Sequence, residues 1–445
     1  MDRYKRRVAQ TRPMYERLKG FRDFYPEEMA ARRELIDQLE ATARQYGFRE
    51  VGTPALERTA MYVEKSGEEI VEELYSFEDA GGRSVALTPE LTPTVARMVV
   101  AKQQALSKPI KWYSTRPFWR YEEPQQGRFR EFYQLNADIF GSADPTADAE
   151  ILAYAGDALR ALGLTAEDFE FRVSHRDILG GLLESISGEV DTRAAIRAVD
   201  KSEKIERAAY YDLLVDAGLT RDQAAEFDEV LTSGDLEAVR AFADTERVDA
   251  AIDNLQAVLD AAADYGVEDL LTVSLETARG LDYYTGVVFE CFDSTGDVSR
   301  AVFGGGRYDD LIESFGGQPM PAVGVAPGLA PLSLLLQRAD AWPGADLATD
   351  YYVLQIGDTR AEAARIVREL RGAGHVVETD VSDRSFGGQL EYADAINAQT
   401  VVIVGEQDLA EGMVTLKNMA SGDQRQVPVD AFPGEHAEPR LSDFE

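Results

Sequence analysis

The chain has 445 residues, 44% of them hydrophobic, so it is long and apolar enough to form two or three domains with folded cores. Its 80 acidic residues outnumber its 46 basic residues and give a formal net charge of −34. The single cysteine, Cys291, excludes an intrachain disulfide and a cysteine-based zinc site. The three histidines, His175, His375 and His436, are too scattered in the sequence to form a histidine-rich metal cluster. We therefore expect no metal site made of a side-chain cluster.

No stretch of the sequence approaches the ~18 consecutive apolar residues of a membrane span. Residues 1–13 are basic, but no apolar run of the kind found in signal peptides follows them. These features predict a cytoplasmic protein that does not contact a membrane.

The acidic residues are spread along the chain and are not gathered in a tail. This distribution favours a salt-adapted surface, on which dense carboxylates keep the protein hydrated, over a surface built for one cationic partner. It predicts a halophilic source. A negative charge of this size argues against nucleic-acid binding, but molar salt screens the repulsion within a few ångströms, so a local arginine track could still hold phosphates.

In chain order, residues 14–174 mix helical and strand patterns. Apolar spacing predicts a helix over 27–46, two strands within 110–140 and a helix over 147–162. Residues 190–268 are rich in Ala, Glu and Asp, and their helical pattern indicates an inserted helical subdomain.

Strand patterns and glycine-dense turns return over residues 270–335. After the Ala341–Gly344 stretch, strands and helices alternate, which predicts a small α/β domain. Its expected elements are strands 351–356, 375–379 and 400–404 and helices 360–371 and 388–397.

A row of three polar side chains is predicted on one strand. Gln134, Asn136 and Asp138 are two residues apart and therefore share one strand face, while apolar residues between them take the other. Such a row suits the floor of a polar pocket. The residues alone leave open an ordinary solvent-exposed strand face.

Three further segments have the composition of a binding site. Arg279–Tyr284 combines an arginine, an acid and two tyrosines, although a tyrosine pair is also common in a core. Gly304–Asp309 contains three glycines that permit close backbone approach, although a simple turn fits as well. Thr88–Pro93 could be a loop that enters a helix. Together these segments supply carboxylate acceptors, hydroxyl donors and arginines, which suits a small zwitterion bound beside a polyphosphate.

At this point the chain resembles the histidyl-tRNA synthetases over nearly its whole length. Lys19–Pro26 resembles the opening segment of that family, and Gly47–Val63 resembles motif 1 of the class II synthetases, which implies a homodimer. Phe118–Gln134 resembles motif 2. The two most specific matches are to the family's histidine-binding motifs, Arg279–Tyr284 and Gly304–Asp309. Asp138 and Arg197–Lys201 resemble the archaeal and eukaryotic branch.

The resemblance implies an α+β fold. It consists of a class II antiparallel-sheet catalytic domain with an inserted helical subdomain, followed by a C-terminal α/β anticodon-binding domain. We expect the catalytic domain over 1–189 and 269–340, the insertion over 190–268 and the anticodon-binding domain over 348–432. The implied reaction joins histidine to tRNA(His) at the expense of ATP, with Mg²⁺ accompanying the ATP.

Residue roles are also implied by the resemblance. Histidine would be held by Glu90, Thr92, Arg120, Gln134, Asp138, Arg279, Tyr283, Tyr284 and Tyr308. ATP would be bound by Arg120, Glu122 and Arg279, and the two arginines would be the catalytic groups. The tRNA acceptor end would meet Gln125, Gln126, Arg128 and Arg130. In the anticodon-binding domain, Arg384, Gln389 and Lys417 are candidates for contact with tRNA.

One position departs from the family pattern. Motif 3 carries an arginine that grips ATP, but here the segment 322–332 has Pro331 in its place. The departure implies either weaker ATP binding or substitution by another arginine, for which Arg307 is a candidate. The departure also keeps open an alternative, a histidine-sensing regulatory paralogue without aminoacylation activity. Such regulators lack the anticodon-like domain.

Overall fold

The computed structural model describes residues 15–63, 72–202, 205–278, 283–298, 300–344 and 347–432. The chain forms two compact units, and the larger one contains residues 32–343. The smaller unit comprises residues 344–445 together with residues 24–31. The basic N-terminal residues 1–14 and the segment 279–282, which includes Arg279, lie outside the described residues.

Eight described strands of the larger unit form one sheet, in the order β1-β5-β6-β11-β10-β9-β7-β8. All neighbours are antiparallel except at the two edges, where β1 and β8 pair in parallel with β5 and β7. The strands are β1 (Arg49–Glu50), β5 (Ile110–Trp119), β6 (Glu131–Phe140), β7 (Phe169–His175), β8 (Leu271–Val273), β9 (Val287–Asp293), β10 (Phe303–Arg307) and β11 (Ala322–Val325).

The predicted strand pair within 110–140 is the centre of this fold. Its strands pair over their whole length, from Ile110 opposite Phe140 to Trp119 opposite Glu131. On β6, Leu135 and Ile139 are buried in the main core. Burying a side chain of this size contributes roughly 1.5–3 kcal/mol. The alternation fixes the register, because a slip by one residue would expose the apolar row.

Helix α5 (Pro145–Ala161) covers the apolar face of this sheet, and its Ile151, Leu152 and Tyr154 are fully buried. Asp144 caps the helix by accepting a hydrogen bond from the backbone N–H of Thr146 at 2.9 Å. This helix matches the one predicted over 147–162.

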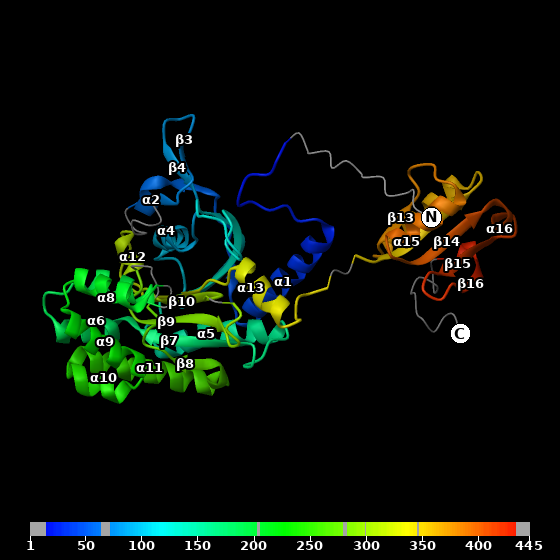
Figure 1. The fold of residues 1–445 in the computed structure, drawn as a ribbon. Coiled ribbons are helices and arrows are strands. Elements are labelled where there is room, and N and C mark those ends of the chain that lie inside the picture. Colours follow the sequence, from blue (N-terminus) through cyan, green and yellow to red (C-terminus); the bar gives the residue numbers. More distant parts are fainter. Residues whose placement is uncertain are drawn as a thin grey trace, which may run out of the picture. The chain divides into compact units, whose positions relative to one another are not determined.

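The predicted helical block becomes a layer of helices beside β7 and β8 (Figure 1). It shares one hydrophobic core with the sheet. The strand-to-helix transition between β7 and this layer falls at His175, whose Nδ1 accepts from the backbone N–H of Asp177 at 3.1 Å, so α6 (Arg176–Ile186) precedes the predicted block of 190–268. The helices of the layer are α6, α7 (Thr192–Val199), α8 (Arg207–Asp216), α9 (Arg221–Ser233), α10 (Leu236–Ala243) and α11 (Glu246–Asp264).

A three-stranded sheet, β2-β4-β3, and several helices complete the part of the chain before residue 344. The strands are β2 (Leu56–Arg58), β3 (Ser76–Glu78) and β4 (Ser84–Leu87). The helices are α1 (Pro26–Gln45), α2 (Thr59–Val63), α4 (Thr92–Lys102), α12 (Leu311–Ser314) and α13 (Leu329–Arg338).

The smaller unit contains a five-stranded sheet in the order β13-β12-β14-β15-β16. Strands β12, β13 and β14 are parallel, and β15 and β16 continue antiparallel. The alternation predicted for this region is present. Its elements are β12 (Thr349–Ile356), α14 (Arg360–Gly372), β13 (Val377–Thr379), α15 (Phe386–Ala395), β14 (Ala398–Gly405), α16 (Glu406–Ala410), β15 (Met413–Asn418) and β16 (Gln424–Pro428). The α+β class predicted from the sequence is confirmed.

Candidate active site

A cleft of about 1000 Å³ opens on the polar face of the eight-stranded sheet. It is lined by residues from β6, β10 and β11, the loop before α4, the turn between β5 and β6 and the start of α13. The size suits a nucleotide together with an amino acid. The sequence-predicted residues in its lining are Glu90, Thr92, Arg120, Glu122, Gln125, Gln126, Arg128, Gln134, Asp138, Tyr283, Tyr284 and Tyr308.

The polar row of β6 forms the floor of the cleft. The alternative that the sequence left open, an ordinary solvent-exposed strand face, is therefore wrong. Asn136 and Asp138 are only 4% and 3% exposed. Gln134 donates a hydrogen bond to the carbonyl of Ala326, directly after β11, at 3.0 Å. The Asn136 Oδ1 atom is buried, and no described residue donates a hydrogen bond to it. An orphaned buried acceptor is costly, so Asn136, which the resemblance did not single out, is suited to receive a ligand donor.

Asp138 lies at the deep end of this row. Its carboxylate accepts a short hydrogen bond from the Tyr308 hydroxyl. Burial raises the pKa of the Asp138 carboxyl to about 7, and the hydrogen bond from Tyr308 offsets only part of that rise. Asp138 can therefore change charge near neutral pH.

Three tyrosine rings form one wall of the deep end. Tyr283 and Tyr284 have ring centroids 5.1 Å apart, and Tyr308 lies 5.8 Å from Tyr283. The Tyr283 hydroxyl donates to Glu90 Oε2 at 3.2 Å. Glu90 and Thr92 are both buried at the entrance to α4. The result is a small compartment with an aromatic wall and a carboxylate at each end.

The glycines of Gly304–Gly306 belong to strand β10, and a simple turn is excluded. A Cβ on Gly305 would lie 2.2 Å from the carbonyl oxygen of Gly324 on β11. A Cβ on Gly324 would in turn lie 2.1 Å from Asp138 Oδ1. Only glycine at both positions lets the strands approach and leaves room for the Asp138 carboxylate.

The opposite end of the cleft is cationic. Arg120, at the end of β5, donates from Nε to the carbonyl of Pro89 at 3.0 Å, which fixes it beside Glu90. Glu122 lies between two guanidinium groups, at 3.8 Å from Arg120 and 3.4 Å from Arg128. Arginines held this way can bind phosphate oxygens without large rearrangement.

Arg130 does not line the cleft. Its Nε donates to the carbonyl of Glu122 at 3.0 Å, and its guanidinium stacks 3.8 Å from the centre of the Tyr121 ring. The residues predicted to meet the tRNA acceptor end are therefore not all in the cleft. Gln125, Gln126 and Arg128 border the cleft, whereas Arg130 supports the turn from outside it.

Comparison with known proteins shows the family of the chain. The family model described as Histidyl-tRNA synthetase matches residues 20–332, and the one described as Anticodon binding domain matches residues 350–438. The chain belongs to the histidyl-tRNA synthetase family.

Its relatives include the histidine–tRNA ligases of Natronomonas pharaonis and Halobacterium salinarum. Each is 70% identical over 97% of this chain and 100% of its own length. Both sources are halophilic archaea, as the acidic composition predicts. The crystal structure of histidyl-tRNA synthetase from Nostoc sp. superposes with a TM-score of 0.78 at 25% identity, covering 94% of this chain and 98% of that one. The predicted family and ligase class are confirmed.

Position 331, where motif 3 of the family has an arginine, carries no charged side chain in this protein. Pro331 is in the first turn of α13 and lines the cleft. Proline fits sterically there, because the first turn of a helix has no intrahelical partner for its N–H. It provides no charge.

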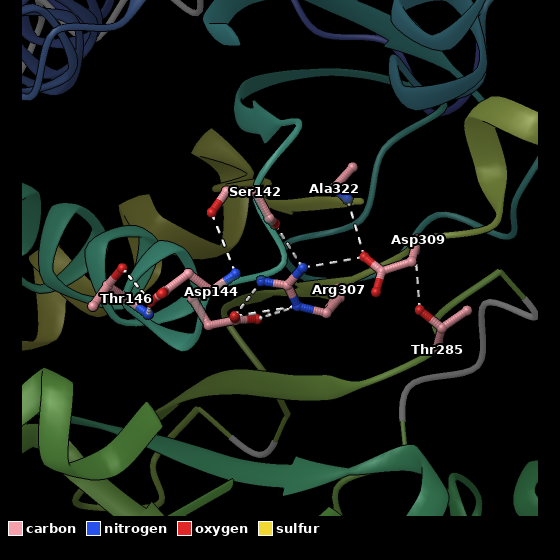
Figure 2. Close-up of polar contacts among 8 residues, drawn as sticks. Ser142, Asp144, Thr146, Thr285, Arg307, Asp309 and Ala322 are labelled. Carbon is pink, nitrogen blue, oxygen red and sulfur yellow. Dashed lines mark hydrogen bonds and ion pairs between the residues drawn. The ribbon is translucent and has the colours of Figure 1, made fainter. Parts of the chain in front are cut away.

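The expectation that Arg307 replaces that charge is wrong. Arg307 is 6% exposed and points away from the cleft, where it forms a bidentate ion pair with Asp148. Its Nη1 also donates to the Ser142 carbonyl at 2.9 Å and to Asp309 at 3.1 Å. Figure 2 shows Arg307 enclosed by these partners. The guanidinium has its hydrogen bonds already and joins β10 to α5.

In the smaller unit, the candidate Gln389 is also structural. It is 3% exposed, accepts from the backbone N–H of Gln355 at 3.1 Å and donates to the same residue's carbonyl at 3.0 Å. Arg384 pairs with Asp380 at 2.7 Å and stacks over Tyr392. Gln389 therefore has no free group for tRNA.

No helix among the described residues is long and apolar enough to cross a membrane. Within the described ranges, no three His, Cys, Asp or Glu side chains gather in a way that could hold a metal ion.

Proposed function

We propose that this histidyl-tRNA synthetase binds histidine in the compartment of Glu90, Asp138 and the three tyrosines and activates it with ATP bound at the arginine end. The histidyl group is then transferred to the 3′-terminal ribose of tRNA(His). The observation that carries the proposal is the division of one cleft into a buried, acid-lined aromatic compartment and an adjacent cationic end.

Histidine is recognised at both of its basic ends. Glu90, with Thr92 beside it, binds the α-ammonium group, and Asp138 accepts from an imidazole N–H. The Asn136 acceptor and Gln134 line the same cleft on β6, on the strand face that carries Asp138. The aromatic wall excludes water, which strengthens each of these hydrogen bonds.

Activation needs no general base, because the histidine carboxylate is already ionised. One of its oxygens attacks the α-phosphorus of ATP, and the bond from that phosphorus to the bridging oxygen of the β-phosphate breaks. Pyrophosphate leaves and histidyl-adenylate forms. Arg120 is fixed beside Glu90 and so meets the α-phosphate, where negative charge develops. Mg²⁺ enters with ATP as part of the substrate and supplies further positive charge. Arg279 is proposed, from the family pattern, to contact the same phosphate.

In the second step a ribose hydroxyl of the terminal adenosine attacks the carbonyl carbon of the adenylate. The bond from that carbon to the phosphate oxygen breaks, and AMP leaves with its phosphate as the acceptor of the hydroxyl proton. Gln125, Gln126 and Arg128 border the cleft entrance and are placed to receive the acceptor end. A cytoplasmic homodimer is proposed as the working state. Exposed apolar side chains in and beside motif 1 support it, since Leu56 on β2, Val63 on α2 and Phe77 on β3 are 43%, 50% and 50% exposed.

The deciding experiment is histidine-dependent ATP–pyrophosphate exchange in molar KCl with Mg²⁺, run beside other amino acids, followed by charging of tRNA(His). Exchange with histidine alone, followed by charging, is the expected result. Histidine binding without exchange would overturn the proposal in favour of a regulatory paralogue. The matched anticodon-binding domain at residues 350–438 argues against that alternative.

A further inference from the structure

The arginines that line the cleft differ in whether their guanidinium groups already pair with carboxylates. Arg120 and Arg128 flank Glu122. Arg338 pairs with Asp168 and Asp293, each at 3.3 Å. Arg300 lies in the connection between β9 and β10, and its guanidinium has no hydrogen bond or ion pair with any described residue. A half-buried guanidinium without a partner is unfavourable unless an anion binds to it.

Arg300 lies close to Pro331, the position at which motif 3 departs from the family pattern. A Cβ built on Gly127 would lie 3.0 Å from Arg300 Nη2 and 3.7 Å from the Cα of Pro331. The Arg300 guanidinium and the Pro331 backbone therefore face the same point beside the turn between β5 and β6. An arginine side chain starting from position 331 would compete for the space that Arg300 now occupies.

The electrostatic surroundings of Arg300 also indicate an anion. Burial and the nearby Arg128 lower the pKa of Arg300, whereas Glu122 raises it. Two guanidinium groups near each other repel, and a polyphosphate bound between them would relieve that repulsion. In the proposed reaction Arg120, held at the histidine compartment, meets the α-phosphate, so Arg128 and Arg300 would meet the β- and γ-phosphates. Arg128 becomes available to the tRNA acceptor end once pyrophosphate has left.

We infer that Arg300 supplies, from the β9–β10 connection, the positive charge that Pro331 removes from α13, and that it binds the pyrophosphate portion of ATP. This assignment rests on the proposed function. It explains how a chain with proline at position 331 keeps a complete phosphate site, and it makes Arg300 a substrate-binding residue.

The test compares the KM for ATP and the KM for histidine in pyrophosphate exchange, in molar KCl. Arg300→Ala is expected to raise the KM for ATP at least tenfold and to leave the KM for histidine within about twofold. Arg300→Lys should retain part of the affinity, because it keeps the charge but not the planar fork. The matched control is Arg221→Ala, which removes the same charge from α9, where Arg221 pairs with the exposed Asp212.

The decisive variant is the double substitution Arg300→Ala with Pro331→Arg. A purely structural role for Arg300 could not be rescued by an arginine on another element, whereas a phosphate-binding role predicts that the KM for ATP returns to within about threefold of the wild type. An unchanged KM for ATP in Arg300→Ala would overturn the inference. So would an equal rise in both KM values without rescue, which would indicate a distorted cleft.

Direct ATP binding by calorimetry separates this inference from the proposed function. If the wild type binds ATP but shows no exchange, the proposed function fails, and the loss of ATP affinity in Arg300→Ala still tests Arg300. If the wild type is active and Arg300→Ala binds ATP as well as it does, only the inference about Arg300 fails.

Discussion

The hydroxyl of Tyr308, directly after β10, donates a hydrogen bond to the buried carboxylate of Asp138 on β6. The two residues are 170 positions apart in the sequence and meet because β11 lies between their strands and carries Gly324 beneath the carboxylate. This pair joins the second histidine motif to the strand that forms the floor of the cleft. It also produces a carboxyl group that titrates near neutral pH.

Replacing Asp138 should change how stability depends on pH. Burial raises the pKa of Asp138 to about 7 in the folded protein, compared with about 3.9 for an unfolded Asp. Between these values the folded state holds a proton that the unfolded state has lost, so stability falls as the pH rises through this window. Asp138→Asn keeps an acceptor for Tyr308 and cannot ionise.

We therefore expect Asp138→Asn to be more stable than the wild type at pH 8, by on the order of 1–3 kcal/mol, and the difference to shrink towards pH 5.5. Thermal unfolding in molar KCl without histidine measures it. If Asp138 were instead ionised over this whole pH range, the melting temperatures of the two proteins would change in parallel with pH. Histidine affinity should fall at least tenfold in the variant, because the amide is a weaker acceptor than a carboxylate.

A methyl group at position 324 should block the histidine compartment and spare the ATP end. The Cβ in Gly324→Ala would lie 2.1 Å from Asp138 Oδ1, so the carboxylate must move. The expected result is a KM for histidine raised at least tenfold, with ATP binding by calorimetry unchanged. Gly188→Ala is the matched control, because no atom lies within 4 Å of its Cβ position. Equal histidine affinity in both variants would argue against a fixed place for Asp138.

Much of this architecture was accessible from the sequence because its signals are local. The two-residue alternation of β6 predicted the strand and put Gln134, Asn136 and Asp138 on one face, but it left open whether that face is exposed or forms the floor of a cleft. The apolar spacing of the smaller unit predicted β12, α14, β13, α15 and β14 to within a few residues, whereas α16, β15 and β16 were not predicted. The order of strands in the eight-stranded sheet could not be read in this way, because β11 pairs with β6 and β9 pairs with β7, which are distant in the sequence.

The error over Arg307 shows where sequence reasoning needed one further step. Gly304 and Tyr308 line the cleft, so on an alternating strand Arg307 has to face the other side. Proximity to the second histidine motif does not by itself show on which face of the strand a side chain lies. Arg300 could not have been found by any local rule, because its closeness to Pro331 arises only when the β9–β10 connection folds against α13.

Arg307 should accordingly matter for stability and little for ATP. Removing one partner of a buried ion pair leaves the other carboxylate without compensation, so Arg307→Met should cost about 3–5 kcal/mol. Arg221→Ala, at an exposed pair, should cost less than about 1 kcal/mol. Thermal unfolding compares the two. At a temperature where Arg307→Met is still folded, its KM for ATP should match the wild type, and a selective rise would restore Arg307 as a phosphate ligand.

The net charge of −34 should make both folding and tRNA charging depend on molar salt. Carboxylates crowded on one surface repel each other, and this repulsion reaches about 10 Å at 0.1 M salt but only about 3 Å at 1 M. The same repulsion opposes the approach of tRNA, so the KM for tRNA should fall as KCl rises towards molar concentrations, opposite to the usual weakening by counterion release. Melting temperature and tRNA charging measured from 0.1 to 3 M KCl test this, with sucrose as a neutral control that stabilises without screening. Full charging activity in 0.1 M KCl with sucrose would show that charge screening is not the reason for the salt requirement. Charging activity that is highest in 0.1 M KCl without sucrose would show that molar salt is not required.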